Sequence, residues 1–259
     1  MLASFTHIFV GIGNGGARII NNIEVDGAVR VSINPAYYLF SQKADEYIGR
    51  IKSFFSGIPG NTMLWLIFDD KPINLEIANL ILRSSPDDAI KLAYVLTPER
   101  ELVESETPQW ARHFETVFYD SLWEFMRGDT AIGSAFDNAA FQIGRMFSKL
   151  YYYLENEMLV NIDYADLFNI IRGGNVGILR MLHDVDFSWH WGIWDRGLIS
   201  IMVGENVPLK NAHRILARFQ EILSEKDVIW GVRVAENLED EIEVLALLTK
   251  RWYHEGGAV

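Results

Sequence analysis

The sequence contains no cysteine, which excludes disulfides, thiol chemistry and cysteine-ligated metals. This composition suits a reducing cytoplasm, where we expect the protein to be located. Basic residues are in the minority, since 23 Lys and Arg stand against 35 Asp and Glu and leave a formal net charge of −12. Nucleic acid and anionic membranes carry charge of the same sign, so we expect no nucleic-acid partner and no direct insertion into a membrane.

Long apolar segments are also missing. No uncharged apolar run reaches about 18 residues, so no transmembrane helix is predicted. The first residues, Met1–His7, lack a basic stretch followed by an apolar run and do not resemble a signal peptide. Hydrophobic residues nevertheless make up 49% of the sequence, which indicates a globular protein. Its 259 residues suffice for one large domain or two small ones.

In the first half of the sequence, short apolar runs alternate with helical patterns. Strands are predicted over residues 8–12, 28–34, 63–68, 90–96 and 114–119. Helices are predicted over residues 17–23, 36–56 and 73–83. This alternation is typical of an α/β fold with a Rossmann-like parallel sheet and helices on both faces.

A long central helix is predicted to begin at Ser134. Ser134 is a suitable N-cap, and Asp137 three residues later completes a weak capping box. The helix carries an apolar stripe at spacings of three and four residues, formed by Phe136, Ala140, Ile143, Phe147, Leu150 and Leu154. The acidic turn that leaves this helix contains Asp163 and Asp166, which face the same way at the start of a new helix.

The pattern changes after Gly174. Strands are predicted over residues 177–182, 197–203, 228–234 and 241–248, with one helix at 209–224 among them. This order indicates a smaller second α/β domain with a mixed sheet. We therefore divide the chain into a nucleotide-binding-like domain (1–133), the central helix with its acidic loop (134–174) and a C-terminal α/β domain (175–259).

A glycine-rich segment, Gly11-Ile-Gly-Asn-Gly-Gly16, connects the first strand to the first helix. Such a layout aims backbone N–H groups and the positive helix end at a phosphate. The candidate ligands are Gly11, Gly13, Asn14, Gly15 and Gly16, together with Asn34 at the end of the second strand. The spacing also fits the dinucleotide fingerprint, but that fingerprint requires an acid after the second strand, where Asn34 stands here. The alternative interpretation is a tight turn that packs helix against strand.

Several motifs together resemble the tubulin/FtsZ superfamily, on the FtsZ side. Asn161-Ile-Asp-Tyr-Ala-Asp166 resembles the Asn-x-Asp-x-x-Asp loop after the family's central helix, and Gly11–Gly16 is similar to its first nucleotide loop. Arg196-Gly-Leu-Ile-Ser-Ile resembles an Arg-Gly-x-Leu-x-x-Ile strand, and residues 227–246 are similar to the last strands of FtsZ. The resemblance implies a GTP-binding domain, a central helix and a smaller second domain.

The resemblance also implies roles for individual residues. In this family, subunits stack head to tail and the acidic loop of one subunit polarises water at its neighbour's nucleotide, so Asp163 and Asp166 would be catalytic in trans. Thr97 would lie on the ribose side, and Asp137 with Asn138 at the guanine edge. The alternatives are helix capping for the acidic loop and for Asp137, and an ordinary turn after Thr97.

One departure from the family decides the functional prediction. Its Gly-Gly-Gly-Thr-Gly-Thr-Gly loop is absent, and Asp69-Asp70-Lys71-Pro72 stands in that region. Like charges at ~4 Å repel by roughly 1 kcal/mol in water and about 4 kcal/mol at intermediate dielectric. Two carboxylates would therefore oppose a triphosphate unless Lys71 or a metal ion offset them.

We therefore predict a shortened FtsZ-like pseudo-GTPase rather than an enzyme. It would act by self-association or by regulating a related polymer, as relatives do in cell division and membrane remodelling, with a second copy or an FtsZ-like protein as its partner. GTP or GDP would bind weakly or not at all, Mg²⁺ would enter only with GTP, and no protein-bound metal site is predicted. The alternatives are an active GTPase that hydrolyses GTP on polymerisation, a dinucleotide-binding oxidoreductase, and an adaptor with an empty pocket.

Overall fold

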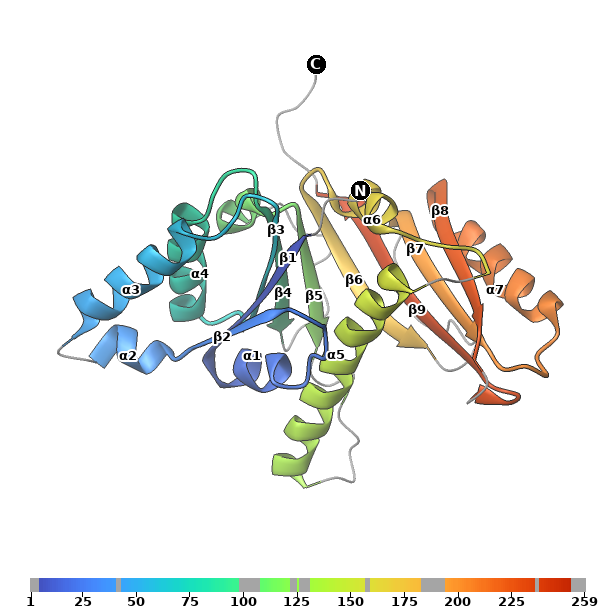
Figure 1. The fold of residues 1–259 in the computed structure, drawn as a ribbon, viewed down its shortest axis with the longest axis horizontal. Coiled ribbons are helices and arrows are strands. Elements are labelled where there is room, and N and C mark those ends of the chain that lie inside the picture. Colours follow the sequence, from blue (N-terminus) through green and yellow to red (C-terminus); the bar gives the residue numbers. More distant parts are fainter. Residues whose placement is uncertain are drawn as a thin grey trace, which may run out of the picture. The chain divides into compact units, whose positions relative to one another are not determined.

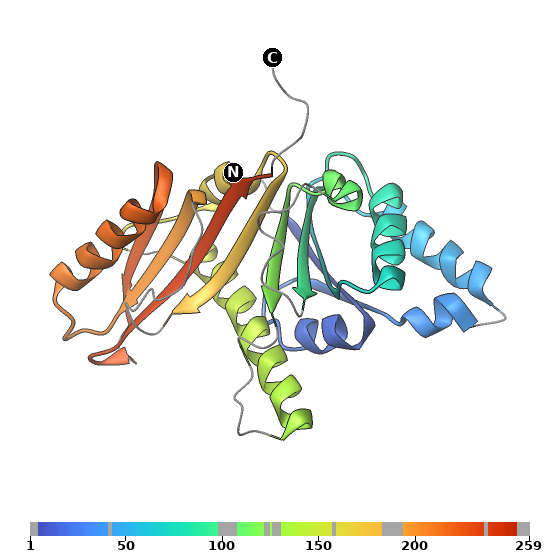
Figure 2. The same ribbon diagram turned by 180° about the vertical axis from the view of Figure 1, so that it is seen from behind.

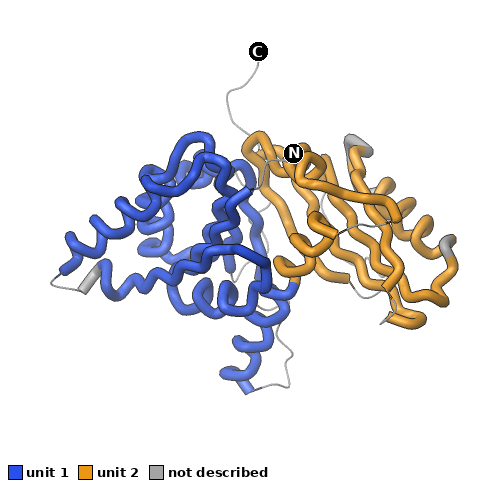
Figure 3. The backbone as a smooth tube through the Cα atoms, viewed as in Figure 1, with its two compact units in different colours: residues 1–145, 253–259 blue, residues 146–252 orange. Residues whose placement is uncertain are grey.

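The computed structural model describes residues 5–40, 43–97, 108–121, 125, 131–156, 159–182, 194–235 and 238–252. The chain forms two compact units (Figure 3), one extending to Arg145 and the other comprising Met146–Trp252. The division predicted from motifs, at residues 133/134 and 174/175, remains a prediction.

The first unit contains a sheet of five parallel strands in the order β2-β1-β3-β4-β5. The strands are β1 (Thr6–Ile12), β2 (Val29–Ile33), β3 (Thr62–Asp69), β4 (Ile90–Thr97) and β5 (Thr116–Ser121). The predicted parallel sheet is thus confirmed. The crossovers β1–β2 and β3–β4 run toward opposite edges, and right-handed crossovers then place their helices on opposite faces.

The helices of the first unit can be followed in Figures 1 and 2. They are α1 (Gly13–Ile20), α2 (Pro35–Phe40), α3 (Ala44–Ser56), α4 (Pro72–Ser84) and the 3₁₀ helix η2 (Gln109–His113). The region predicted to be helical, residues 36–56, forms two separate helices, α2 and α3. The rings of Tyr37 and Tyr47 lie 5.9 Å apart, so the aromatic residues of this segment pack α2 against α3.

His7 lies in this core on β1 and is 7% exposed. Burial lowers its pKa to about 4, because a low-dielectric environment disfavours the imidazolium ion. The unfolded chain therefore takes up a proton between about pH 6.5 and 4 that the folded chain does not bind.

We expect the free energy of unfolding to fall by about 2 kcal/mol between pH 6.5 and 4 on account of His7. Urea unfolding across this range should show the loss, and His7→Gln should lack that part of it. The exposed His213→Gln variant is the control and should keep the wild-type slope. Equal slopes for wild type and His7→Gln would contradict the prediction.

The second unit contains a mixed sheet in the order β6-β9-β7-β8. Its strands are β6 (Asn175–Leu182), β7 (Trp194–Val203), β8 (Leu223–Val234) and β9 (Ile242–Arg251), and its helices include α6 (Tyr164–Ile171) and α7 (Leu209–Ile222). β9 runs antiparallel to β6 and β7, whereas β7 and β8 are parallel. The predicted mixed sheet is confirmed.

The long helix α5 (Ile132–Glu155) belongs to both units, since the division falls after Arg145. Its predicted stripe is buried from Ala140 to Leu154, but Phe136 is 39% exposed. The capping box predicted at Ser134 is wrong. The helix begins at Ile132, and the Ala135 amide donates to the Ala131 carbonyl at 2.9 Å, so Ser134 lies inside the first turn. In the described part of the chain, no helix is both long and apolar enough to cross a bilayer.

Candidate functional site

The glycine segment is where β1 passes directly into α1. The helix begins at Gly13, within the predicted loop, so Gly13, Asn14 and Gly15 form its first turn. Gly13 has a φ of +75°, a conformation that glycine adopts without strain. Ile12 is the N-cap residue, no side chain caps the helix, and its first turn contains no acidic residue. Backbone N–H groups and a positive helix end are therefore presented here, as an anion site requires.

Two of the four glycines are required by packing alone. A Cβ atom on Gly16 would lie 2.0 Å from the carbonyl oxygen of Ile67 on β3, and one on Gly11 would lie 2.5 Å from the carbonyl oxygen of Gly16. No side chain fits at either position. Gly15 differs, because its Cβ would lie 3.6 Å from Leu96 Cδ1, an ordinary contact. The close packing of α1 on the sheet accounts for Gly11 and Gly16 without any ligand.

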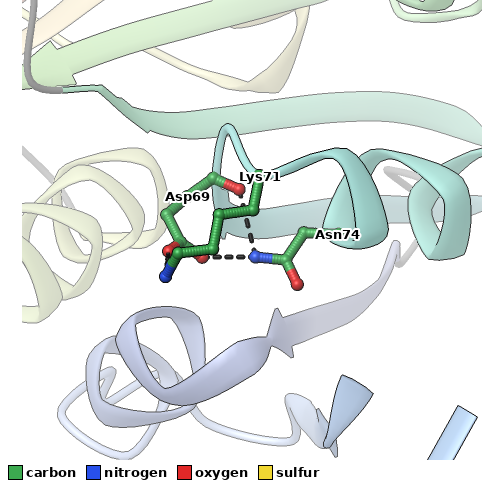
Figure 4. Close-up of polar contacts among 3 residues, drawn as sticks. All are labelled: Asp69, Lys71 and Asn74. Atoms are coloured by element: carbon green, nitrogen blue, oxygen red, sulfur yellow. Dashed lines mark hydrogen bonds and ion pairs between the residues drawn. The ribbon is translucent and has the colours of Figure 1, made fainter. Parts of the chain in front are cut away.

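Beside this loop lies a cluster of three polar residues, which we call the Asp69 cluster: Asp69, Lys71 and Asn74 (Figure 4). Asp69 ends β3, Lys71 precedes α4, and Asn74 lies in the first turn of that helix. The Asn74 amide Nδ2 donates to the Asp69 carbonyl at 3.1 Å and to its carboxylate Oδ1. Lys71 Nζ forms an ion pair with the other carboxylate oxygen, Oδ2. Both partners therefore converge on one carboxylate.

The Asp69 cluster lies against the start of α1. The position of a Cβ on Gly13 is 3.3 Å from Asn74 Nδ2 and 3.5 Å from Asp69 Oδ1. Asn74 is 2% exposed, whereas the side chain of Lys71 is 69% exposed. Next to the glycine turn, the amide is therefore buried, the Asp69 carboxylate is partly exposed (24%), and the lysine is the most exposed of the three.

Asp70, the second acid of this turn, has different surroundings. It is exposed, and its amide donates to the Leu96 carbonyl at 3.2 Å. Burial raises the pKa of Tyr119 on β5, and the negative charge of the Asp70 carboxylate makes a smaller contribution in the same direction. Of the two acids predicted to replace the family loop, Asp69 is thus the one placed beside Gly13.

Asn34 and Thr97 share the edge of the sheet with the glycine loop, because they follow or end parallel strands. The side-chain oxygen Oδ1 of Asn34 accepts from the main-chain amide of Ala36 at 3.0 Å. The main-chain amide of Asn34 donates to the Tyr47 hydroxyl at 3.2 Å. Asn34 therefore caps the start of α2. Thr97 ends β4 and is 5% exposed. The rest of the predicted ribose-side loop, Pro98 and Glu99, lies outside the described residues. Ligand roles for both residues stay predictions.

Asp137 and Asn138 are both exposed on α5. Asp137 pairs with Arg18 in the last turn of α1, at 3.2 Å between Oδ1 and Nη1. The two side chains are 71% and 51% exposed, so solvent screens the pair and its stabilising contribution is small. The structure thus gives Asp137 a partner at the end of α1 away from Gly13. Guanine recognition by these two residues stays a prediction.

In the second unit, Asp163 and Asp166 form a complete capping box at the start of α6. Asp163 Oδ1 accepts from the Asp166 amide at 3.0 Å, and the Asp163 amide donates to Asp166 Oδ2 at 2.9 Å. The Tyr164 hydroxyl donates to Oε1 of Glu155, the last residue of α5, at 2.8 Å. Burial raises the pKa of Tyr164, and this hydrogen bond raises it further. The geometry of Asp163 and Asp166 is that of a helix cap, which is one of the two interpretations of this loop. A catalytic role in trans stays a prediction.

The other end of α6 is fixed by Arg196, a contact that sequence reasoning missed. Its guanidinium donates to the Asn169 carbonyl at 2.6 Å, to the Arg172 carbonyl at 3.2 Å and to Asn175 Oδ1 at 3.0 Å. A Cβ atom on Gly197 would lie 2.8 Å from Leu248 Cδ2. The Arg-Gly pair at the start of β7 is therefore explained by helix capping and strand packing.

Comparisons with known proteins connect this arrangement to one family. FtsZ 2 of Halobacterium salinarum, a cell division protein, is 30% identical over 112 residues, which cover 35% of this chain and 28% of that protein. FtsZ 2 of Pyrococcus furiosus is 26% identical over 137 residues, covering 45% of this chain and 33% of that protein. These matches thus span about a third or less of each relative. No protein-family model matches the chain.

Solved structures extend the likeness to nearly the whole chain. An empty FtsZ dimer from M. jannaschii matches with a TM-score of 0.70 and 18% identity, covering 99% of this chain and 95% of that one. The chain therefore has the fold of FtsZ, and its sequence is similar to archaeal FtsZ 2 proteins over 35–45% of its length. A second match to this FtsZ-like chain is a GTPγS-bound protofilament of CetZ2 from Haloferax volcanii, with a TM-score of 0.67, 12% identity and coverage of 96% and 94%.

Potential metal ligands do not cluster in the described parts of the chain. Within those residues, no group of three or more His, Asp or Glu side chains is placed to hold a metal ion. The polar groups that the structure gathers at the glycine turn are those of the Asp69 cluster, and the acids of the α6 turn bond to each other's backbone amides.

Proposed function

We propose that this chain is an FtsZ-like assembly protein whose nucleotide site is degenerate, and that it acts by self-association or by regulating a related polymer. The observation that carries the proposal is the position of the Asp69 carboxylate, 3.5 Å from where a Cβ atom on Gly13 would lie. A phosphate at the same turn would meet a like charge, whose ion-pair partner Lys71 has a side chain 69% exposed.

The proposed partner is a second copy of the chain or an FtsZ-like protein. Two structural relatives support it, since one is an FtsZ dimer and another a CetZ2 protofilament. The two surfaces proposed for stacking are the glycine-loop surface of the first unit and the Asp163–Asp166 surface of the second. The latter keeps the Asn-x-Asp-x-x-Asp spacing on a capped and therefore ordered helix start. Cell division is the process that the names of the sequence relatives suggest.

We expect the purified chain to associate to the same extent with GTP, with GDP and without nucleotide. Analytical ultracentrifugation over a concentration series measures the association, and a phosphate-release assay on the same samples should stay at background. The physical reason is that a nucleotide that does not bind cannot change the contacts between subunits. An unchanged melting temperature with GTP would agree, because a ligand that binds the folded state stabilises it.

Asp166→Asn is the matched variant for this experiment. It removes the charge but keeps an oxygen that can accept from the Asp163 amide, so the helix cap can persist. Phosphate release that rises with wild-type concentration and is lost in Asp166→Asn would contradict the proposal. That result would favour the second candidate, an active GTPase in which the exposed Lys71 reaches the phosphates.

The oxidoreductase alternative has less support. A dinucleotide-binding sheet would account for the first unit only, whereas the FtsZ fold also accounts for the mixed sheet of the second. Asn34 further weakens it, because this residue caps α2 where the dinucleotide fingerprint places an acid for the ribose.

A further inference from the structure

The Asp69 carboxylate lies beside the start of α1, the end of the helix at which a turn of this layout can bind a phosphate. α1 begins at Gly13 without a side-chain cap and without an acid of its own in the first turn. Its positive end therefore lacks a compensating negative group from within the helix. Asp69 Oδ1, from the end of the neighbouring strand β3, is 3.5 Å from the Cβ position of Gly13 and supplies such a charge.

The amide of Asn74 shows that this carboxylate is held in place. Its Nδ2 faces two acceptors, the carbonyl and the carboxylate of Asp69, so only the amino end of the amide suits this position. The opposite atom, Asn74 Oδ1, is buried and has no hydrogen-bond partner among the described residues. Leaving a buried acceptor unsatisfied is unfavourable. The Asn74 amide is therefore oriented by Asp69, and its free acceptor lies beside the same glycine turn, 3.5 Å from the Cβ position of Gly13.

We propose that Asp69 is an internal anion that takes the place of a phosphate at the glycine turn and thereby excludes phosphate-bearing ligands. Asp69 is then the residue that determines the specificity of this site, and Lys71 and Asn74 are positioning residues that hold its carboxylate. The inference deepens the proposed degenerate site and rests on it. It also makes the loss of phosphate binding a property of one side chain, which substitution can reverse.

We expect Asp69→Asn and Asp69→Ala to bind inorganic pyrophosphate and GTP at least about tenfold more tightly than wild type. Both variants remove the charge, and only the alanine also removes the volume. Isothermal titration calorimetry on the full chain gives the dissociation constants, and thermal unfolding verifies that each variant is folded. Guanosine, which carries no phosphate, is the third ligand, and its affinity should be the same in all variants.

Asp70→Asn is the control, because it removes one negative charge from the same turn while leaving the Asp69 cluster intact. Its affinity for pyrophosphate should change less than about threefold. An equal gain in Asp70→Asn would assign the effect to net charge and overturn the role of Asp69. Weak binding by wild type and by both folded Asp69 variants would overturn this inference while leaving the assembly proposal standing. Tight binding of GTP by wild type, unchanged in the variants, would overturn both.

Discussion

Gly16→Ala is expected to abolish the cooperative folding of the first unit or to lower its free energy of unfolding by more than about 4 kcal/mol. The added methyl carbon would lie 2.0 Å from the carbonyl oxygen of Ile67, an atom of the main chain in a central strand. Because neither the strand nor α1 can move without breaking its other contacts, the clash cannot be relieved cheaply. Circular dichroism during urea unfolding measures the loss.

Gly15→Ala is the matched control for this experiment. Its methyl group would lie 3.6 Å from Leu96 Cδ1, which is ordinary contact, and alanine favours the helix more than glycine does. We expect it to change stability by less than about 1 kcal/mol in either direction. Gly16→Ala with wild-type stability would show that the glycines of this turn are not required by packing. Ligand binding would then be the remaining explanation for the glycines of this turn.

Glu243→Ala is expected to lower the free energy of unfolding by about 3–5 kcal/mol. Glu243 lies on β9 and is 4% exposed. Its carboxylate forms an ion pair with Lys149 and accepts from the Tyr153 hydroxyl at 3.2 Å, both on α5. Truncation removes the counter-charge of a lysine whose side chain is only 20% exposed. The loss would be a large fraction of the stability of a typical domain, about 5–15 kcal/mol, and denaturant titration measures it directly.

The double variant Lys149→Met with Glu243→Leu, compared with Glu243→Leu alone, separates this explanation from a simple loss of packing. It replaces both charges by apolar groups of similar size, and such replacements of buried pairs are often nearly neutral. We expect it to recover most of the stability that Glu243→Ala loses. A double variant as unstable as Glu243→Leu alone would indicate that the uncompensated charge of Lys149 is not decisive, because both variants keep the volume.

The strands were predictable because the sheet of the first unit is buried on both faces. Leu64, Trp65 and Leu66 are consecutive in β3 and all 0% exposed, so a continuous apolar run was sufficient to locate the strand. The mixed sheet of the second unit followed in the same way from its short apolar runs. The helix caps were less predictable. Ser134 has the residue type of a cap, but the backbone of α5 continues two residues further toward the N-terminus.

The candidate site was predictable in its parts but not in its contacts. The sequence places the glycine turn after β1 and acids after β3, and adjacent parallel strands bring such segments to one edge of the sheet. It does not indicate which acid points at the turn, and Asn74 was missed altogether. A lone asparagine in the apolar first turn of α4, directly after Lys71-Pro72-Ile73, was the available signal. Its partner is determined by the turn geometry between β3 and α4, which single-sequence patterns do not specify.

The capping box of α6 makes the acids of this turn part of the helix they begin. One oxygen of each carboxylate already accepts a main-chain amide, so a partner that recruited both groups fully would compete with those two bonds. The opposite end of the helix is held independently by Arg196. Engagement of this surface would therefore loosen the first turn of α6 but leave its last turn intact. Hydrogen exchange would then report assembly in two ways. The amide of Asp166 would exchange faster, whereas other amides covered by the subunit contact would exchange more slowly.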